Sequence, residues 1–238
     1  MDFALFLLAA ALFASVGHGG ASAYLLVMVL LGFAPDTLRP TALTLNIIVS
    51  AFATFSFRKS GHFPKGLFLP LILASVPCAA LVAAYIDLRP GIFHSLLGGA
   101  LIIAAIRLCI PSKNFDLSGE KPNTITLVGI GAIIGALSGL LGIGGGILLT
   151  PILIFFRWTS VKSAAALTAP FVLLNSISGL IGLGWERYTP APNLPFLIIA
   201  VMLGGWIGAG YGSRRAAPQP LRMILGGVLC IAAAKLVF

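Results

Sequence analysis

Charged side chains are scarce in this chain: 9% of its 238 residues are Asp, Glu, Lys or Arg, whereas 59% are hydrophobic. Such a composition cannot supply the charged surface of a soluble domain. Runs of about 20 apolar residues recur along the chain, and each is long enough to cross a bilayer core of roughly 30 Å. The sequence therefore predicts an all-α polytopic protein that lies in a lipid bilayer.

Sequence patterns of enzymes and metal proteins are also missing. The chain has no P-loop, no HExxH and no Ser-His-Asp arrangement. Cys78, Cys109 and Cys230 show no CxxC spacing, so they indicate neither a metal site nor a disulfide framework. No Asp or Glu falls in the middle of an expected span, so the carboxylate proton relay that is common in pumps is missing. We expect no enzyme activity, no catalytic residue, no bound metal and no cofactor.

Basic residues outnumber acidic ones by 15 to 6, which gives a formal net charge of +9. They lie in the short connections between the expected spans. This distribution is typical of membrane topology rather than of binding to a nucleic-acid backbone. We therefore expect no nucleic-acid partner.

An internal duplication divides the chain. LGGALIIAAIRL at 97–108 recurs as LGGVLCIAAAKL at 225–236, and GHGGA at 17–21 matches GIGGG at 142–146. Two shorter matches, Ala-Leu-Thr and Leu-Pro, follow in the same order, and all four offsets lie between 124 and 128 residues. We therefore predict a first repeat, a polar linker and a second repeat, at residues 1–110, 111–123 and 124–238.

Each repeat is expected to hold one glycine-interrupted segment followed by three uninterrupted spans. The interrupted segments are 3–33 and 125–156. The first could be mistaken for a signal peptide, but its first charge is the acidic Asp2 and the segment recurs in the second repeat, so we expect it to be retained. The expected spans lie at about 41–57, 66–86, 92–110, 164–183, 194–212 and 224–238.

The basic residues indicate how the two repeats are oriented. If each interrupted segment crosses the membrane once, the 15 Lys and Arg residues split eight to seven. If each segment turns back at its glycines, 11 lie on one side and four on the other: Arg39, Arg89, Arg187 and Lys235. The positive-inside rule favours the second arrangement. It predicts two inverted repeats, each with a re-entrant helix pair and three transmembrane helices, and both termini outside the cytoplasm.

Helices that break at matching places in two halves indicate the binding site of a transporter. A second half-helix that starts near Ala21 or near Ile147 would present free N–H groups and a positive dipole end to an anion. The candidate substrate-binding backbone is Gly17, Gly19, Gly20, Gly142, Gly144, Gly145 and Gly146. Candidate side chains are His18, Thr44, Asn46, Thr168 and Asn175, with Ser50, Ser138 and Ser178 as further polar residues of the spans.

Structural alternatives exist for these residues. The glycines could serve only to pack helices closely, as small residues do in membranes. Ser and Thr could bond their own i−4 carbonyl oxygens. His18 could bind an anion, carry a proton or simply bond a carbonyl, and it has no counterpart in the second repeat, where Ile143 stands.

The run GIGGGILLTPILI followed by KSAAALTAPFVLLNSISGLIGL resembles the repeat signature of the sulfite exporter TauE/SafE family, also called the 4-toluene sulfonate uptake permeases. That signature is a GxGGG break, a proline (here Pro151) and an Ala-x-x-Thr span (Ala165 to Thr168). The first repeat, GHGGASAYLLVMVLL with RPTALTLNIIVSAF, is similar to a degenerate copy that has Ala21 as its fifth residue and lacks the proline. The resemblance implies a secondary transporter of sulfite, sulfoacetate or other organosulfonates in a bacterial inner membrane.

We expect such a protein to move its anion by alternating access. Import of an anion against an inside-negative potential costs about 2.3 kcal/mol per charge per 100 mV and would call for a coupled ion such as a proton, whereas export would be favoured. The sequence does not fix the direction, the coupling ion or the oligomeric state. A passive anion channel and a non-transporting membrane scaffold remain the alternatives.

Overall fold

All regular elements in the described part of the chain are helices. Five of them are long and apolar enough to cross a membrane, which confirms the prediction of an all-α polytopic membrane protein. Nearly all of the expected linker, most of the span 92–110 and the whole span 224–238 lie outside the described residues. The structure is a computed structural model, and it describes residues 2–58, 63–87, 91–93, 95–96, 98–99, 102 and 122–214.

Two of the apolar segments are broken where the glycines stand. Gly142 ends one helix, and Gly20 and Gly145 each precede a new one; all three have left-handed backbone, which costs glycine little. At Gly142 this is a common way for a helix to end. The four helices of these pairs are α1 (Asp2–Ala14), α2 (Ala21–Leu30), α6 (Thr124–Leu141) and α7 (Gly146–Phe155).

The second pair is less symmetrical than two equal half-helices. With 18 residues, α6 is about 27 Å long, close to the thickness of a bilayer core, whereas the 10 residues of α7 span only about 15 Å. Asn123 caps α6 by accepting a hydrogen bond from the Thr126 N–H at 2.7 Å. The cap fixes the start of α6, so that it extends well beyond a half-helix before Gly142 ends it.

Four long helices complete the described bundle. Helix α3 begins six residues before the expected span and thereby includes Arg39 and Pro40. Ser160 caps α8 by accepting a hydrogen bond from the Ser163 N–H at 3.2 Å, so α8 also begins earlier than expected. The four helices are α3 (Pro35–Arg58), α4 (Lys65–Tyr85), α8 (Val161–Leu183) and α9 (Leu194–Arg214).

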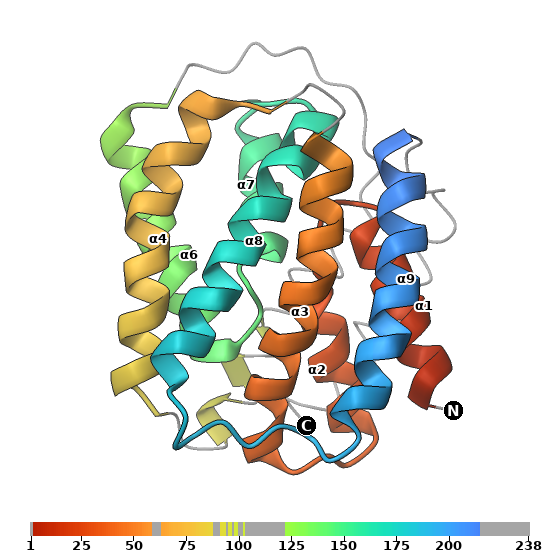
Figure 1. Cartoon of the computed structure of the whole chain (residues 1–238). Coiled ribbons are helices and arrows are strands. Elements are labelled where there is room, and N and C mark those ends of the chain that lie inside the picture. The colour runs from red at the N-terminus through yellow and green to blue at the C-terminus, as the bar shows by residue number, and fades with distance from the viewer. Residues whose placement is uncertain are drawn as a thin grey trace.

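Helices α3 and α8 pack against each other at the centre of the bundle, with α2 packed on α3 and α7 packed on α8 (Figure 1). On one side α4 packs against α6 and α8; on the other, α9 packs against α1 and α3. Helices at matching places in the two expected repeats therefore have matching neighbours. They also run in opposite directions in Figure 1: α3 rises where α8 descends, and α4 descends where α9 rises.

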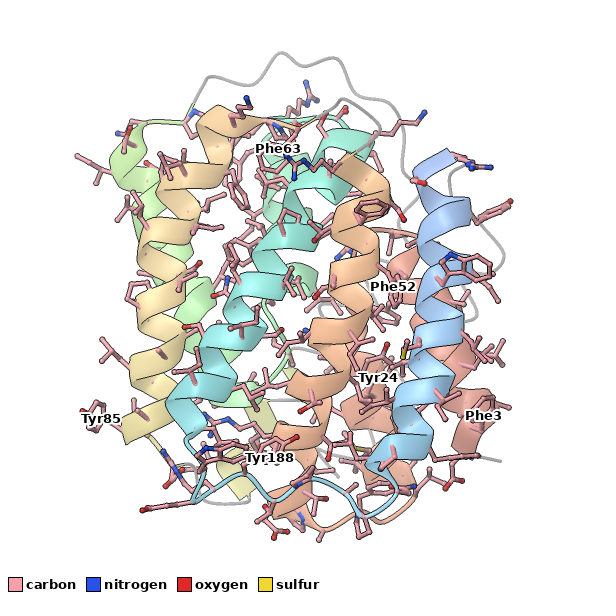
Figure 2. The ribbon with its side chains drawn as sticks, viewed as in Figure 1. Phe3, Tyr24, Phe52, Phe63, Tyr85 and Tyr188 are labelled. Atoms are coloured by element: carbon pink, nitrogen blue, oxygen red, sulfur yellow. The ribbon has the colours of Figure 1, made fainter. Side chains whose placement is uncertain are left out.

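The outer surface of the bundle is apolar. Large exposed side chains cover α4 and α9, including Leu69, Leu73 and Trp206, each at least 60% exposed. Such side chains suit contact with lipid tails rather than water. Tyr85 lies at the end of α4 on the periphery, whereas Tyr24 points into the bundle (Figure 2). The buried polar residues lie mainly on α3 and α8, the two central helices.

Candidate functional site

The two helix breaks meet at Asn46, in the middle of α3. The Asn46 side chain is fully buried. Its Oδ1 accepts a hydrogen bond from the backbone N–H of Ala21, the first residue of α2, at 3.1 Å. Its Nδ2 donates a hydrogen bond to Ser176 Oγ on α8 at 2.7 Å. One amide therefore connects the first break to both central helices.

Glycine is required on both sides of this amide. A Cβ built on Gly19 would overlap Asn46 Oδ1, and a Cβ built on Gly144 would overlap Asn46 Nδ2 and come within 2.9 Å of Ser176 Oγ. The Asn46 side chain thus lies between the glycine runs of the two repeats. The duplicated motifs, 125 residues apart in sequence, face one another across it.

His18 also reaches from the first break to the second. Its Nδ1 lies 3.0 Å from the carbonyl oxygen of Val16, and its half-buried ring packs edge-on against Phe13. A Cβ on Gly146 would come within 3.4 Å of the His18 ring and within 2.9 Å of Thr168 Cγ2. The junction therefore brings together His18, Asn46 and Thr168 from the expected side chains, and Gly19, Gly144 and Gly146 from the expected backbone.

Of the four remaining expected glycines, Gly142 packs against Arg39 and the other three pack close to the junction. Gly17, with a φ of +78°, packs against the backbone of Ala165 on α8. Gly20 packs against the ring of Tyr24, and Gly145 packs against Ile134 and Phe171. These contacts explain why bulkier residues do not fit there, whether or not a ligand binds.

Thr168, expected to contact the anion, instead forms a hydrogen bond with another side chain. Its hydroxyl lies 2.9 Å from that of Thr150, so α8 and α7 share a hydrogen bond inside the bundle. Both residues are buried. The contact joins the middle of α7 to α8.

Two of the expected side chains, Thr44 and Asn175, form hydrogen bonds with residues outside the junction. Thr44 donates to the Pro40 carbonyl oxygen at 2.8 Å, as the i−4 alternative predicts, and lies 3.2 Å from the hydroxyl of Tyr188. In Figure 2, Tyr188 sits at the end of the bundle where α8 finishes. Asn175 Nδ2 donates to Ser75 Oγ on α4 at 3.1 Å and to the Phe171 carbonyl oxygen at 2.9 Å.

The structure also adds residues that the sequence interpretation left out. Ser176 accepts from Asn46, and the Tyr24 hydroxyl donates to the Gly19 carbonyl oxygen at 2.9 Å. The sequence held a signal for each residue. Ser176 follows the candidate Asn175, and Tyr24 comes four residues after the last glycine of the first run. Both stand on the sides of helices that face the break.

The electrostatics of the junction come from the backbone. The N-cap residues of α2 and α7 are Gly20 and Gly145, which have no side chain that could cap the helix. The starts of α2 and α7 carry the positive ends of their helix dipoles, and the N–H groups of the first two residues of each helix have no acceptor within the helix. Asn46 accepts from one of them, that of Ala21. In the described part of the chain, no three His, Cys, Asp or Glu side chains are grouped to hold a metal ion.

Comparison with known proteins fits this architecture. The family model described as "Sulfite exporter TauE/SafE" matches residues 3–236. The chain belongs to the sulfite exporter TauE/SafE family. It is therefore a multi-pass membrane protein of a transporter family, and the resemblance drawn from its glycine motifs is confirmed.

Relatives of this TauE/SafE protein carry transporter names. The chain is 38% identical to the "probable membrane transporter protein y4hK" of Sinorhizobium fredii, over 100% of this chain and 97% of the relative. It is 26% identical to "probable membrane transporter protein YjnA" of Bacillus subtilis, over 95% of each chain. A third relative, "probable membrane transporter protein MJ0441" of Methanocaldococcus jannaschii, is 32% identical over 63% of this chain and 58% of its own. No solved structure matches the chain.

Proposed function

We propose that this chain is a secondary transporter of a small sulfur-containing anion, such as sulfite, sulfoacetate or another organosulfonate. The observation that carries the proposal is the convergence of two glycine breaks on one buried amide, Asn46. Helix starts at such breaks present N–H groups and positive dipole ends to an anion. The description of the family supports sulfite as the substrate class.

Alternating access is the mechanism that this arrangement supports. Side chains of α3 and α8 fill the junction: Asn46, Val172 and Ser176 all come within 3 Å of a Cβ built on Gly144. An anion can enter only if the two repeats move apart on one side. The opposite directions of counterpart helices (Figure 1) support two inverted repeats that rock about α3 and α8.

The charge distribution supports an orientation in the inner membrane of a bacterium with both termini outside. Described Lys and Arg residues concentrate at the end of the bundle where α3 stops and α8 begins: Arg58, Lys65, Arg157, Lys162 and Arg214. At the other end, Arg39 and Arg187 stand among four acidic residues: Asp2, Asp36, Asp87 and Glu186. The positive-inside rule assigns the first end to the cytoplasm.

Transport in proteoliposomes tests the proposal. We expect saturable sulfite flux that acetate does not compete for, and, if a proton is coupled, an inward proton gradient accelerates import. Gly144→Ala abolishes the flux, because its methyl group overlaps Asn46 and Ser176. Gly32→Ala is the matched control: Gly32 has a φ of +75°, similar to that of Gly144 at +70°, but open space around it.

Each alternative predicts a different result. A passive channel gives flux that follows the electrochemical gradient without saturation or a coupled ion. A scaffold gives no flux, and Gly144→Ala then leaves the activity of any partner unchanged. If folded wild-type protein moves no sulfur oxyanion, the proposed function is wrong.

A further inference from the structure

A cavity of about 490 Å³ opens at the end of the bundle where α3 begins and where α4 and α8 end. This size is within the range of pockets that hold small molecules. We call it the vestibule. It is lined by Pro35, Asp36, Arg39, Pro40, Asp87, Phe93, Leu140, Leu183, Glu186, Arg187 and Thr189. Its lining includes charged groups that the sites at the helix breaks do not use.

Arg39 is the unusual member of this lining. Its Nε and Nη2 atoms are buried, and neither has a hydrogen-bond partner within the part of the chain that the structure describes. A guanidinium is a fork of N–H donors that matches the oxygens of an oxyanion. Burying such donors without a partner is costly. The energetic cost is explained if a ligand supplies the acceptor.

Arg187, the other arginine of the vestibule, is already occupied. Its Nη1 forms an ion pair with Asp87 at 2.8 Å, and its Nη2 donates to the Ala83 and Ala84 carbonyl oxygens at 3.1 and 2.6 Å. The pair neutralises Asp87. The remaining carboxylates, Asp36 and Glu186, are exposed to solvent, which screens their charge. Among the described residues that line the vestibule, Arg39 therefore offers a positive charge whose Nε and Nη2 donors have no partner.

The lining of the vestibule includes residues that lie next to the second helix break. A Cβ built on Gly142 would come within 2.9 Å of Arg39 Cγ, and Leu140, which precedes the break on α6, lines the vestibule. Gly144, which faces Asn46, is two residues further along the chain. An anion bound at Arg39 would thus lie beside the second helix break.

We propose that the vestibule is a second anion-binding site, in which the Arg39 guanidinium holds the oxyanion before it reaches, or after it leaves, the helix breaks. This inference rests on the proposed function, because it assigns the transported oxyanion to both sites. It predicts that Arg39 determines the affinity for the anion from the side of the membrane that the vestibule faces.

Sulfite binding to purified protein in detergent, followed through the melting temperature at low ionic strength, tests the inference. We expect Arg39→Gln to raise the half-saturating sulfite concentration at least tenfold, and Arg39→Lys to raise it less, because the ammonium keeps the charge but not the fork. Arg58→Gln is the matched control. Arg58 is an exposed arginine at the other end of the same helix, and its replacement leaves the response unchanged.

Two further readouts separate the vestibule from the junction and from folding. Gly144→Ala keeps its response to sulfite while it loses transport, because the vestibule remains intact. Without sulfite, Arg39→Gln melts no lower than wild type, because the variant removes buried donors that lack partners. A lower melting temperature without sulfite would make Arg39 structural and overturn the inference.

The other possible outcomes distinguish a vestibule site from binding at the helix breaks alone. If Arg39→Gln responds to sulfite like wild type, or if Gly144→Ala alone abolishes the response, the anion binds only at the helix breaks. The vestibule site is then wrong, while transport by the wild type keeps the proposed function. If wild type neither binds nor transports a sulfur oxyanion, both proposals fail.

Discussion

Asn46 contacts the glycine runs of both halves of the chain. Asn46→Ala removes the acceptor of the Ala21 N–H and the donor to Ser176 Oγ, both inside the bundle. We expect a loss of about 1–3 kcal/mol in the free energy of unfolding, since a buried polar group is left unpaired. We also expect sulfite flux to fall at least tenfold. Reversible unfolding in SDS and flux in proteoliposomes measure the two effects.

Asn46→Asp separates stability from anion binding. The carboxylate still accepts from the Ala21 N–H, but it no longer donates to Ser176 and brings a negative charge to the junction. We expect flux to be lost even where folding is retained. Thr44→Val is the control on the same helix, because its hydroxyl bonds Pro40 and Tyr188 away from the breaks. Equal loss in both variants would contradict a special role for Asn46.

Residue chemistry predicted part of this site. Asn46 and His18 were found because burying an amide or an imidazole in a membrane helix needs a reason. Tyr24 and Ser176 were missed because their roles depend on which side of a helix faces the break, and nearly all sides of these helices are apolar. Arg39 was counted only toward topology, because the sequence did not show that α3 begins early enough to place it beside Gly142.

Glycine stripes hold the outer helices to their neighbours. On α6, Gly131, Gly135 and Gly139 lie against the carbonyl oxygens of Leu71, Ser75 and Ala79 on α4, so that a Cβ at any of them would overlap backbone. In the pair of α9 and α1 the glycines lie on α9: Gly204 and Gly208 lie against Leu7 and Ala11 of α1, and Gly212 lies against Ser15, which follows α1. Close backbone approach of this kind stabilises helix pairs in membranes.

Gly135→Leu tests the role of the stripe. Its side chain would meet the Ser75 backbone and force α6 away from α4. We therefore expect the free energy of unfolding to fall by about 1–3 kcal/mol, the usual cost of overpacking. Gly129→Leu is the matched control, because it lies on the same helix with open space around it. Melting temperatures of the two variants in detergent provide the comparison. Equal melting temperatures would show that the stripe is not a close interface.

At the scale of elements, the glycine motifs located both breaks, because consecutive glycines favour left-handed backbone and weaken a helix. The lengths of the flanking helices were harder to predict. Asn123 caps α6 early enough to give it a nearly full crossing, and the prolines of α3, α4 and α8 lie inside helices instead of ending them. In a membrane, neighbouring helices and water satisfy the freed carbonyl groups, so proline is a weak boundary signal there.

For the whole molecule, the inverted arrangement makes a prediction that parallel repeats contradict. If the repeats are inverted, the α2–α3 connection and the α8–α9 connection lie on one side of the membrane, and the start of α8 lies on the other. Parallel repeats place the α2–α3 connection on the same side as the start of α8. Exposed residues mark these places: Ala34, Pro192 and Lys162.

Cysteine labelling measures the difference. In a variant with Cys78, Cys109 and Cys230 replaced by Ser, single cysteines are introduced as Ala34→Cys, Pro192→Cys and Lys162→Cys. We expect a membrane-impermeant maleimide to label the first two in intact spheroplasts, and the third only after permeabilisation. Because the vestibule opens at the end where α3 begins, the same result would assign it to the outside. Labelling of Ala34→Cys and Lys162→Cys from one side would make the repeats parallel and remove the two-fold relation on which alternating access depends.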